Sequence, residues 1–129
     1  MEEALSNSVN TVAVKVLEEV GILEVIRQAN KMGILEKLPN EPSLALGTGE
    51  IRINELAGAY ASYVNHGKPV EPFLIQKITN SKDSILEVFK PKIAEKEAFS
   101  AETRQIMLEM MKSTVNSGTA SRIRGSYNL

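Results

Sequence analysis

Residues 3–14 read EALSNSVNTVAV, and this stretch places a short polar turn, Ser8-Val9-Asn10, directly in front of an apolar helical pattern. Serine and asparagine side chains accept hydrogen bonds from the unpaired N–H groups of a first helical turn, so the tripeptide can simply start a helix. The same residues can instead present a hydroxyl and a carboxamide to a cleft from a rigid support. Ser126-Tyr127-Asn128 repeats the spacing with no helical pattern after it, so three residues alone do not decide between these uses.

The chain of 129 residues has the composition of one globular domain, with 43% hydrophobic and 24% charged residues. A net charge of −1 gives no electrostatic footprint for nucleic acid, so no nucleic-acid partner is expected. There are no cysteines, and the one histidine, His66, lies in a predicted turn without an acidic residue at ligand spacing. Neither a metal nor another cofactor is therefore expected. No apolar run is long enough to span a membrane, and no signal-peptide pattern opens the chain.

Two glycines end two predicted helices in the first third of the chain. The segment 10–20 carries valines at four-residue spacing on one face, and Gly21 closes it. A second amphipathic segment over 22–32 ends at Gly33 in the same way. Because β-branched residues lower helix propensity, burial must stabilise the first of these helices.

The middle of the chain combines a loop with a small-residue helix. Residues 39–49 contain two prolines and two glycines and predict a loop with a tight backbone turn, since no phosphate-binding fingerprint is present. Residues 53–65 then predict a helix, in which Ala57, Gly58 and Ala59 allow neighbouring segments to approach closely.

A β-hairpin is predicted at about 73–89. The segments 73–78 and 85–89 are short and rich in β-branched and aromatic residues, and a longer polar loop separates them. A charged link over 90–97 follows and has no periodicity.

The last predicted helix begins after Ser100, a good N-cap, and stops at Gly118. One face of this helix is rich in methionine, which is more typical of core packing than of a recruitment groove. Residues 119–129 are polar and unpatterned, so we expect a loose or extended tail there. The members of the methionine-rich stripe are Ile106, Met107, Met110, Met111, Thr114 and Val115.

Seven motifs occur together in a fixed order. They are Ser8-x-Asn10 with Thr-Val-Ala-Val, Ser-Leu-Ala-Leu-Gly at 43–47, Glu-Leu-Ala-x-Ala-Tyr-Ala at 55–61, Asn65-x-Gly67, Pro72 before the hairpin, Ser-Ala-Glu-Thr at 100–103 and Gly118-Thr119-Ala120. This order resembles the transpeptidase domain of class A penicillin-binding proteins over essentially the whole chain. The resemblance implies a mainly α fold with one small β-hairpin, the helical part of a penicillin-binding-protein and β-lactamase-like transpeptidase domain.

The resemblance also implies a chemistry. In that family a serine in Ser-x-x-Lys attacks a D-Ala carbonyl of a peptidoglycan stem peptide, and an amine from a second strand resolves the acyl-enzyme into a cross-link. β-Lactams acylate the same serine. Carried over to this chain, Ser8 is expected to relay protons and Asn10 to bind the substrate amide, because a hydroxyl nucleophile needs a proton path and a fixed substrate.

Two motifs of the family are missing. No serine has a lysine three residues later, and neither Lys-Thr-Gly nor Lys-Ser-Gly occurs. In the family these motifs lie before and after the segment that this chain resembles. We therefore expect residues 1–129 to be a partial transpeptidase domain that contains no nucleophile and is inactive alone, with 119–129 leading to a missing sheet strand.

The expected parent protein is extracytoplasmic, held at the bacterial membrane by an N-terminal anchor outside this chain, with a glycosyltransferase domain upstream. Its partners would be stem peptides and β-lactams. Uncovered apolar faces also predict self-association of the excised piece. The alternatives are a stand-alone helical interaction module, or a piece of a class B penicillin-binding protein or of a D,D-carboxypeptidase.

Overall fold

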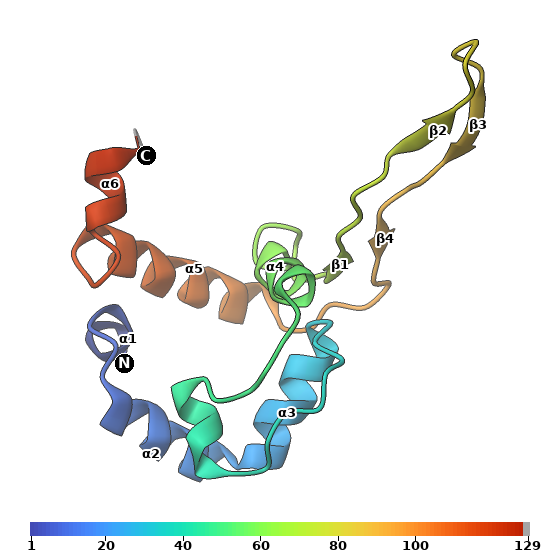
Figure 1. The fold of residues 1–129 in the computed structure, drawn as a ribbon. Helices are drawn as coiled ribbons and strands as arrows, with labels where there is room; N and C mark the ends of the chain where they lie inside the picture. The colour runs from blue at the N-terminus through green and yellow to red at the C-terminus, as the bar shows by residue number, and fades with distance from the viewer. Residues whose placement is uncertain (128–129) are drawn as a thin grey trace.

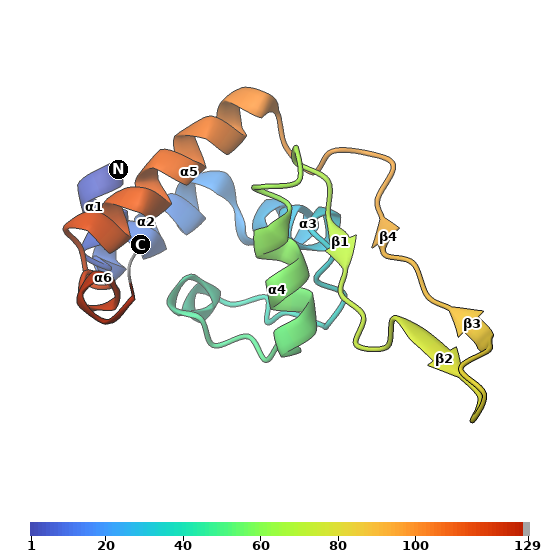
Figure 2. The same cartoon turned by 90° about the horizontal axis from the view of Figure 1, so that it is seen from above.

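A computed structural model describes residues 1–127 and is mainly helical, as predicted (Figure 1). An antiparallel arm extends away from the helices in both views (Figures 1 and 2). None of the helices within 1–127 is long and apolar enough to cross a membrane. The elements are α1 (Glu2–Ser6), α2 (Asn10–Val20), α3 (Ile22–Lys31), the 3-10 helix η1 (Pro42–Leu46), α4 (Ile53–Ala61), β1 (Val70–Glu71), β2 (Lys77–Thr79), β3 (Ile85–Val88), β4 (Lys92–Ile93), α5 (Ala101–Asn116) and α6 (Arg122–Ser126).

The two glycine-terminated helices are present as α2 and α3. The Gly21 N–H donates to the Leu17 carbonyl at 2.8 Å and closes α2. Leu17 is only 4% exposed, and α2 packs against η1. Leu17 is the buried residue of α2, whereas Val12 and Val16 are half-buried and Val20 is 52% exposed, so the valine face is only partly covered.

The main hydrophobic cluster lies between α3 and α4. Its buried members are Ile34, Leu38 and Ala59. On α4, a Cβ placed on Gly58 would lie 2.3 Å from the Val70 carbonyl oxygen, so only glycine allows β1 to approach this closely. This confirms the predicted close approach at the small residues of this helix. The half-buried residues packed against the cluster are Ile26, Ala29, Met32, Leu44 and Ile51.

The predicted hairpin is present, but its first strand is shorter than expected. Strands β2 and β3 pair antiparallel, and the loop closes through the Asn80 side-chain oxygen, which accepts from the Lys82 and Ser84 N–H groups. Strand β2 begins at Lys77 and not at residue 73. A second ladder, β1 with β4, forms at the base of the arm where the sequence predicted only a charged link. Two residues per strand are too few to show a period of two.

Three further short elements were not predicted. Helix α1 has five residues, η1 lies within the predicted loop 39–49, and α6 lies within the segment 119–129 that was expected to be loose. Each contains about one or two turns, which is too short for a hydrophobic period to appear in the sequence. At η1, Pro42 occupies the first turn, where its fixed φ favours a helical start.

Helix α5 begins as predicted, but its methionine stripe is not core. The Ser100 hydroxyl oxygen accepts from the Thr103 N–H at 3.1 Å, which caps the helix. No residue of α5 is buried, and Ile106 is 50% exposed. The expectation of a buried stripe is therefore wrong for this structure. The physical reason is that Met107, Met110 and Met111 line cavities and do not meet a packed layer.

Candidate functional site

The turn between α1 and α2 fixes the backbone of Ser8. The Val9 N–H donates to the Ala4 carbonyl at 2.9 Å, and the Ser8 N–H donates to the Leu5 carbonyl at 3.1 Å. This pair of bonds is the Schellman arrangement, in which the residue after the helix end adopts the left-handed conformation. Ser8 does so with φ of 53°, at a position that usually holds glycine.

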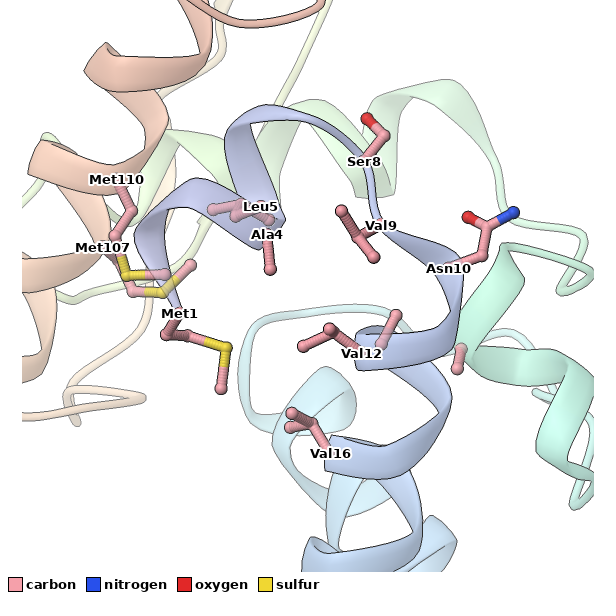
Figure 3. A pocket seen from close by; sticks show the side chains of 12 residues that line it. Met1, Ala4, Leu5, Ser8, Val9, Asn10, Val12, Val16, Met107 and Met110 are labelled. Carbon is pink, nitrogen blue, oxygen red and sulfur yellow. The ribbon is translucent and has the colours of Figure 1, made fainter.

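Neither polar side chain of the turn caps the following helix. Val9 is the N-cap of α2, with no side-chain hydrogen bond, and Asn10 is already the first helical residue. Both Ser8 and Asn10 are exposed. Figure 3 shows their polar groups directed away from the apolar side chains of Val9, Val12 and Val16. Of the two uses that the sequence left open, the structure therefore favours presentation of a hydroxyl and a carboxamide over helix capping.

The end of α5 lies directly against this turn. The Ser8 and Thr119 hydroxyl oxygens are 3.4 Å apart, and either can be the donor. The Thr119 N–H donates to the Ser6 carbonyl at 3.0 Å. Ser6 is only 4% exposed, and its hydroxyl donates to the Ser113 hydroxyl at 3.0 Å. These contacts join segments more than 100 residues apart in the chain.

An apolar groove of about 520 Å³ lies beside the Ser8 turn, between α1, α2 and α5 (Figure 3). Ser8 and Asn10 belong to its wall, and none of the other lining side chains carries a charge. The groove thus has a hydrophobic surface, and Ser8 and Asn10 lie at its edge with their polar groups directed away from its valine side chains. The other lining residues are Met1, Ala4, Leu5, Val9, Val12, Ala13, Val16, Ala45, Met107 and Met110.

A second apolar cavity of about 200 Å³ separates α1 and α5 from α4. Leu5 and Met107 line both this cavity and the groove. Tyr63 lines the second cavity and stacks on Phe99, with ring centroids 4.7 Å apart. Burial, and secondarily the neighbouring Tyr60, raises the pKa of the Tyr63 phenol above its usual value. Tyr63 is thus a half-buried aromatic that keeps its proton to a higher pH than an exposed tyrosine.

The structure brings Ser8 and Asn10 to one wall of one groove. In the second Ser-x-Asn pattern, Ser126 is the last residue of α6, and Asn128 lies outside the described residues. Sequence reasoning assigned no role to Ser6, Ser113 or Thr119. Gly118-Thr119 stood among the motifs, but nothing local showed that it meets Ser8. Within 1–127, no cluster of three or more histidine or acidic residues could hold a metal ion.

The chain is thus a helical domain with Ser-x-Asn on a turn beside an apolar groove. Residues 1–127 match the family model described as the penicillin binding protein transpeptidase domain, and the chain belongs to this family. It is 38% identical over 119 residues to penicillin-binding protein 1A of Aquifex aeolicus, and this alignment covers 92% of this chain and 16% of that protein. It is 36% identical over 92 residues to penicillin-binding protein 1A of Pseudomonas aeruginosa, covering 70% of this chain and 11% of that protein.

Solved structures give the same result. The crystal structure of penicillin-binding protein 1A from Haemophilus influenzae superposes with a TM-score of 0.62 at 29% identity, over 72% of this chain and 14% of that one. The D,D-transpeptidase domain of a peptidoglycan glycosyltransferase from Eggerthella lenta gives 0.73 at 18% identity, over 93% of this chain and 37% of that one, which supports the fold alone. The predicted fold class and the class A resemblance are confirmed. The chain spans about a sixth of the length of the Aquifex relative.

Proposed function

We propose that this chain is the Ser-x-Asn part of a D,D-transpeptidase that cross-links peptidoglycan stem peptides through a serine acyl-enzyme. In this proposal Ser8 relays a proton during acyl transfer and Asn10 binds an amide of the substrate. The observation that carries the proposal is the Ser8 turn: a non-glycine residue with φ of 53° presents an exposed hydroxyl two residues before the exposed Asn10, in a chain of the transpeptidase family.

Backbone strain supports a functional reason for serine at this position. A residue in the left-handed conformation is destabilised unless it is glycine, and such residues concentrate at functional sites. Ser8 makes no capping bond to α2, so helix initiation does not account for it. A hydroxyl required for proton transfer does account for a serine where glycine would be more stable.

The reacting serine has to come from outside this chain, since no serine here is followed by lysine at the required spacing. We infer that in the longer protein the segment carrying Ser-x-x-Lys covers the apolar groove. The uncharged lining of the groove suits an apolar helix, and the position of Ser8 and Asn10 on its wall would bring both near a nucleophile on that helix. The isolated chain would then be inactive, and residues 119–129 would lead into a strand that carries Lys-Thr-Gly.

The longer protein would bind stem peptides and β-lactams, as the names of the relatives suggest. We further propose that it acts on the outer side of the bacterial cytoplasmic membrane, is anchored by a segment outside this chain and carries a glycosyltransferase domain. The family match favours this function over a stand-alone helical interaction module, and the 1A relatives favour class A over class B or a carboxypeptidase.

Labelling with a fluorescent penicillin tests the proposal. The isolated chain should show no mass increase by intact mass spectrometry, while the longer protein should gain one penicillin. Peptide mapping should then place the adduct on a serine outside residues 1–129. A stoichiometric adduct on any serine of this chain would overturn the proposal, and so would a longer protein that forms no adduct.

A further inference from the structure

Two hydroxyl groups face each other where α1 meets the end of α5. The Ser8 and Thr119 hydroxyl oxygens are 3.4 Å apart, which is longer than the usual O–H···O distance of about 2.5–3.0 Å, so the contact is weak, and either group can donate. Ser8 is the residue to which the proposed function assigns proton transfer. Its other neighbours in the turn, Asn7 and Val9, use their backbone groups to close α1 and open α2. Thr119 is thus the side chain that meets the Ser8 hydroxyl within the described residues.

The position of Thr119 is fixed from both sides. Its N–H donates to the Ser6 carbonyl at 3.0 Å, and a Cβ on Gly118 would lie 2.3 Å from that same oxygen. Glycine is therefore required next to Thr119 for the backbones to come this close. The Ser6 hydroxyl adds a third link, to Ser113 on the last turns of α5. These contacts share the buried Ser6 as a partner, and together they hold the Thr119 hydroxyl next to the Ser8 turn.

We propose that Thr119 is a positioning residue, whose hydroxyl orients the Ser8 hydroxyl for proton transfer, and that Gly118 and Ser6 keep it in place. This inference rests on the proposed function of Ser8.

The chemistry of a relay explains why a second hydroxyl is useful. A serine that relays a proton accepts one and donates another, so its hydroxyl has to point in a defined direction at each moment. On an exposed turn the side chain would otherwise rotate freely among its three rotamers. When the Ser8 oxygen is about to receive a proton, the Ser8 O–H can donate to the Thr119 oxygen. When Ser8 gives a proton away, the Thr119 O–H can donate to the Ser8 oxygen. Thr119 itself gains and loses no proton overall.

The test uses the longer protein that carries this chain with its Ser-x-x-Lys segment. Four variants are compared: Thr119→Val, which keeps the shape and removes the hydroxyl, Thr119→Ser, which keeps the hydroxyl, Ser8→Ala, and the double variant Ser8→Ala/Thr119→Val. Thr79→Val, on the exposed arm, is the matched control. The readouts are the second-order rate of acylation by a fluorescent penicillin and the melting temperature.

We expect Thr119→Val to slow acylation about tenfold, equivalent to about 1.4 kcal/mol, with melting unchanged, while Thr119→Ser and the control stay within about twofold of wild type. The decisive result is the cycle: after Ser8→Ala, Thr119→Val should have no further effect, because its hydroxyl then has nothing to orient. Additive losses, or a wild-type rate for Thr119→Val, would overturn the inference. If Thr119→Val fails to fold, Thr119→Ala replaces it in the same cycle. A wild-type rate for Ser8→Ala would instead refute the proposed function of Ser8.

Discussion

Replacing Ser8 by glycine should stabilise the chain, although it removes a proposed functional hydroxyl. Ser8 has φ of 53°, a conformation that costs a non-glycine residue about 1–2 kcal/mol. Glycine removes this cost, but its greater conformational freedom in the unfolded chain lowers the gain in stability by about 0.4–1 kcal/mol. The contact with Thr119 contributes little, because both hydroxyls are exposed and 3.4 Å apart. The net expectation is a gain of about 0.5–1 kcal/mol in the free energy of unfolding.

Urea denaturation of the chain, followed by far-UV circular dichroism, measures this gain. Ser8→Ala keeps the strained backbone and loses the hydroxyl, so it should be no more stable than wild type. Ser117→Gly is the matched control: it lies at the end of α5 with φ of −141°, where there is no such strain to relieve, and should lower stability. If Ser8→Gly proves less stable than Ser8→Ala, the left-handed turn is not strained and the argument for a functional serine fails.

Three further predictions concern packing, titration and assembly. Gly118→Ala should destabilise the chain by about 1–3 kcal/mol, because the new Cβ would lie 2.3 Å from the Ser6 carbonyl oxygen. Gly125→Ala is the control and should be neutral or stabilising, because a Cβ there would have no atom within 4 Å. Equal melting curves for the two variants would contradict the packing at Ser6. Tyr63 has a raised pKa when folded, so its contribution to stability is full below its unfolded pKa of 10.0 and is lost as pH rises through the folded pKa. Tyr63→Phe should therefore flatten this alkaline loss of stability, and parallel stability–pH curves for wild type and Tyr63→Phe would refute the assignment. Light scattering of the isolated chain should show an average mass that rises with concentration, because its apolar surfaces are exposed. The rise should be smaller for Leu86→Lys on the exposed arm. A constant monomer mass would show that the apolar surfaces do not associate.

The sequence predicted the elements whose stability is local or periodic. Helices α2 and α3 follow from apolar spacing ended by Gly21 and Gly33, and α5 follows from the Ser100 cap. The hairpin follows from two β-rich segments around a polar loop. The methionine stripe was predicted as core because periodicity reports which residues share a face and does not report what covers that face.

The remaining features depend on contacts between distant segments. Helix α1 is too short to be stable alone, and it packs against α5, more than 90 residues further along the chain. The Ser8–Thr119 and Ser6–Ser113 contacts have the same origin, and no local pattern marks them. The Ser-x-Asn pattern itself was visible in the sequence. Only the backbone of Ser8 distinguishes presentation of its side chain from helix capping.

The most direct test of the proposed function compares the two serines that begin a Ser-x-Asn pattern. In the longer protein, Ser8→Ala and Ser126→Ala are each measured for the rate of acylation by a fluorescent penicillin. Because Ser8 lies on the wall of the groove and is proposed to relay a proton, Ser8→Ala should slow acylation about 100-fold or more. Ser126 ends the short helix α6, and its replacement should leave the rate within about twofold of wild type, well under the loss expected for a residue in proton transfer. Equal effects of the two substitutions, or a wild-type rate for Ser8→Ala, would contradict the assignment of proton transfer to Ser8.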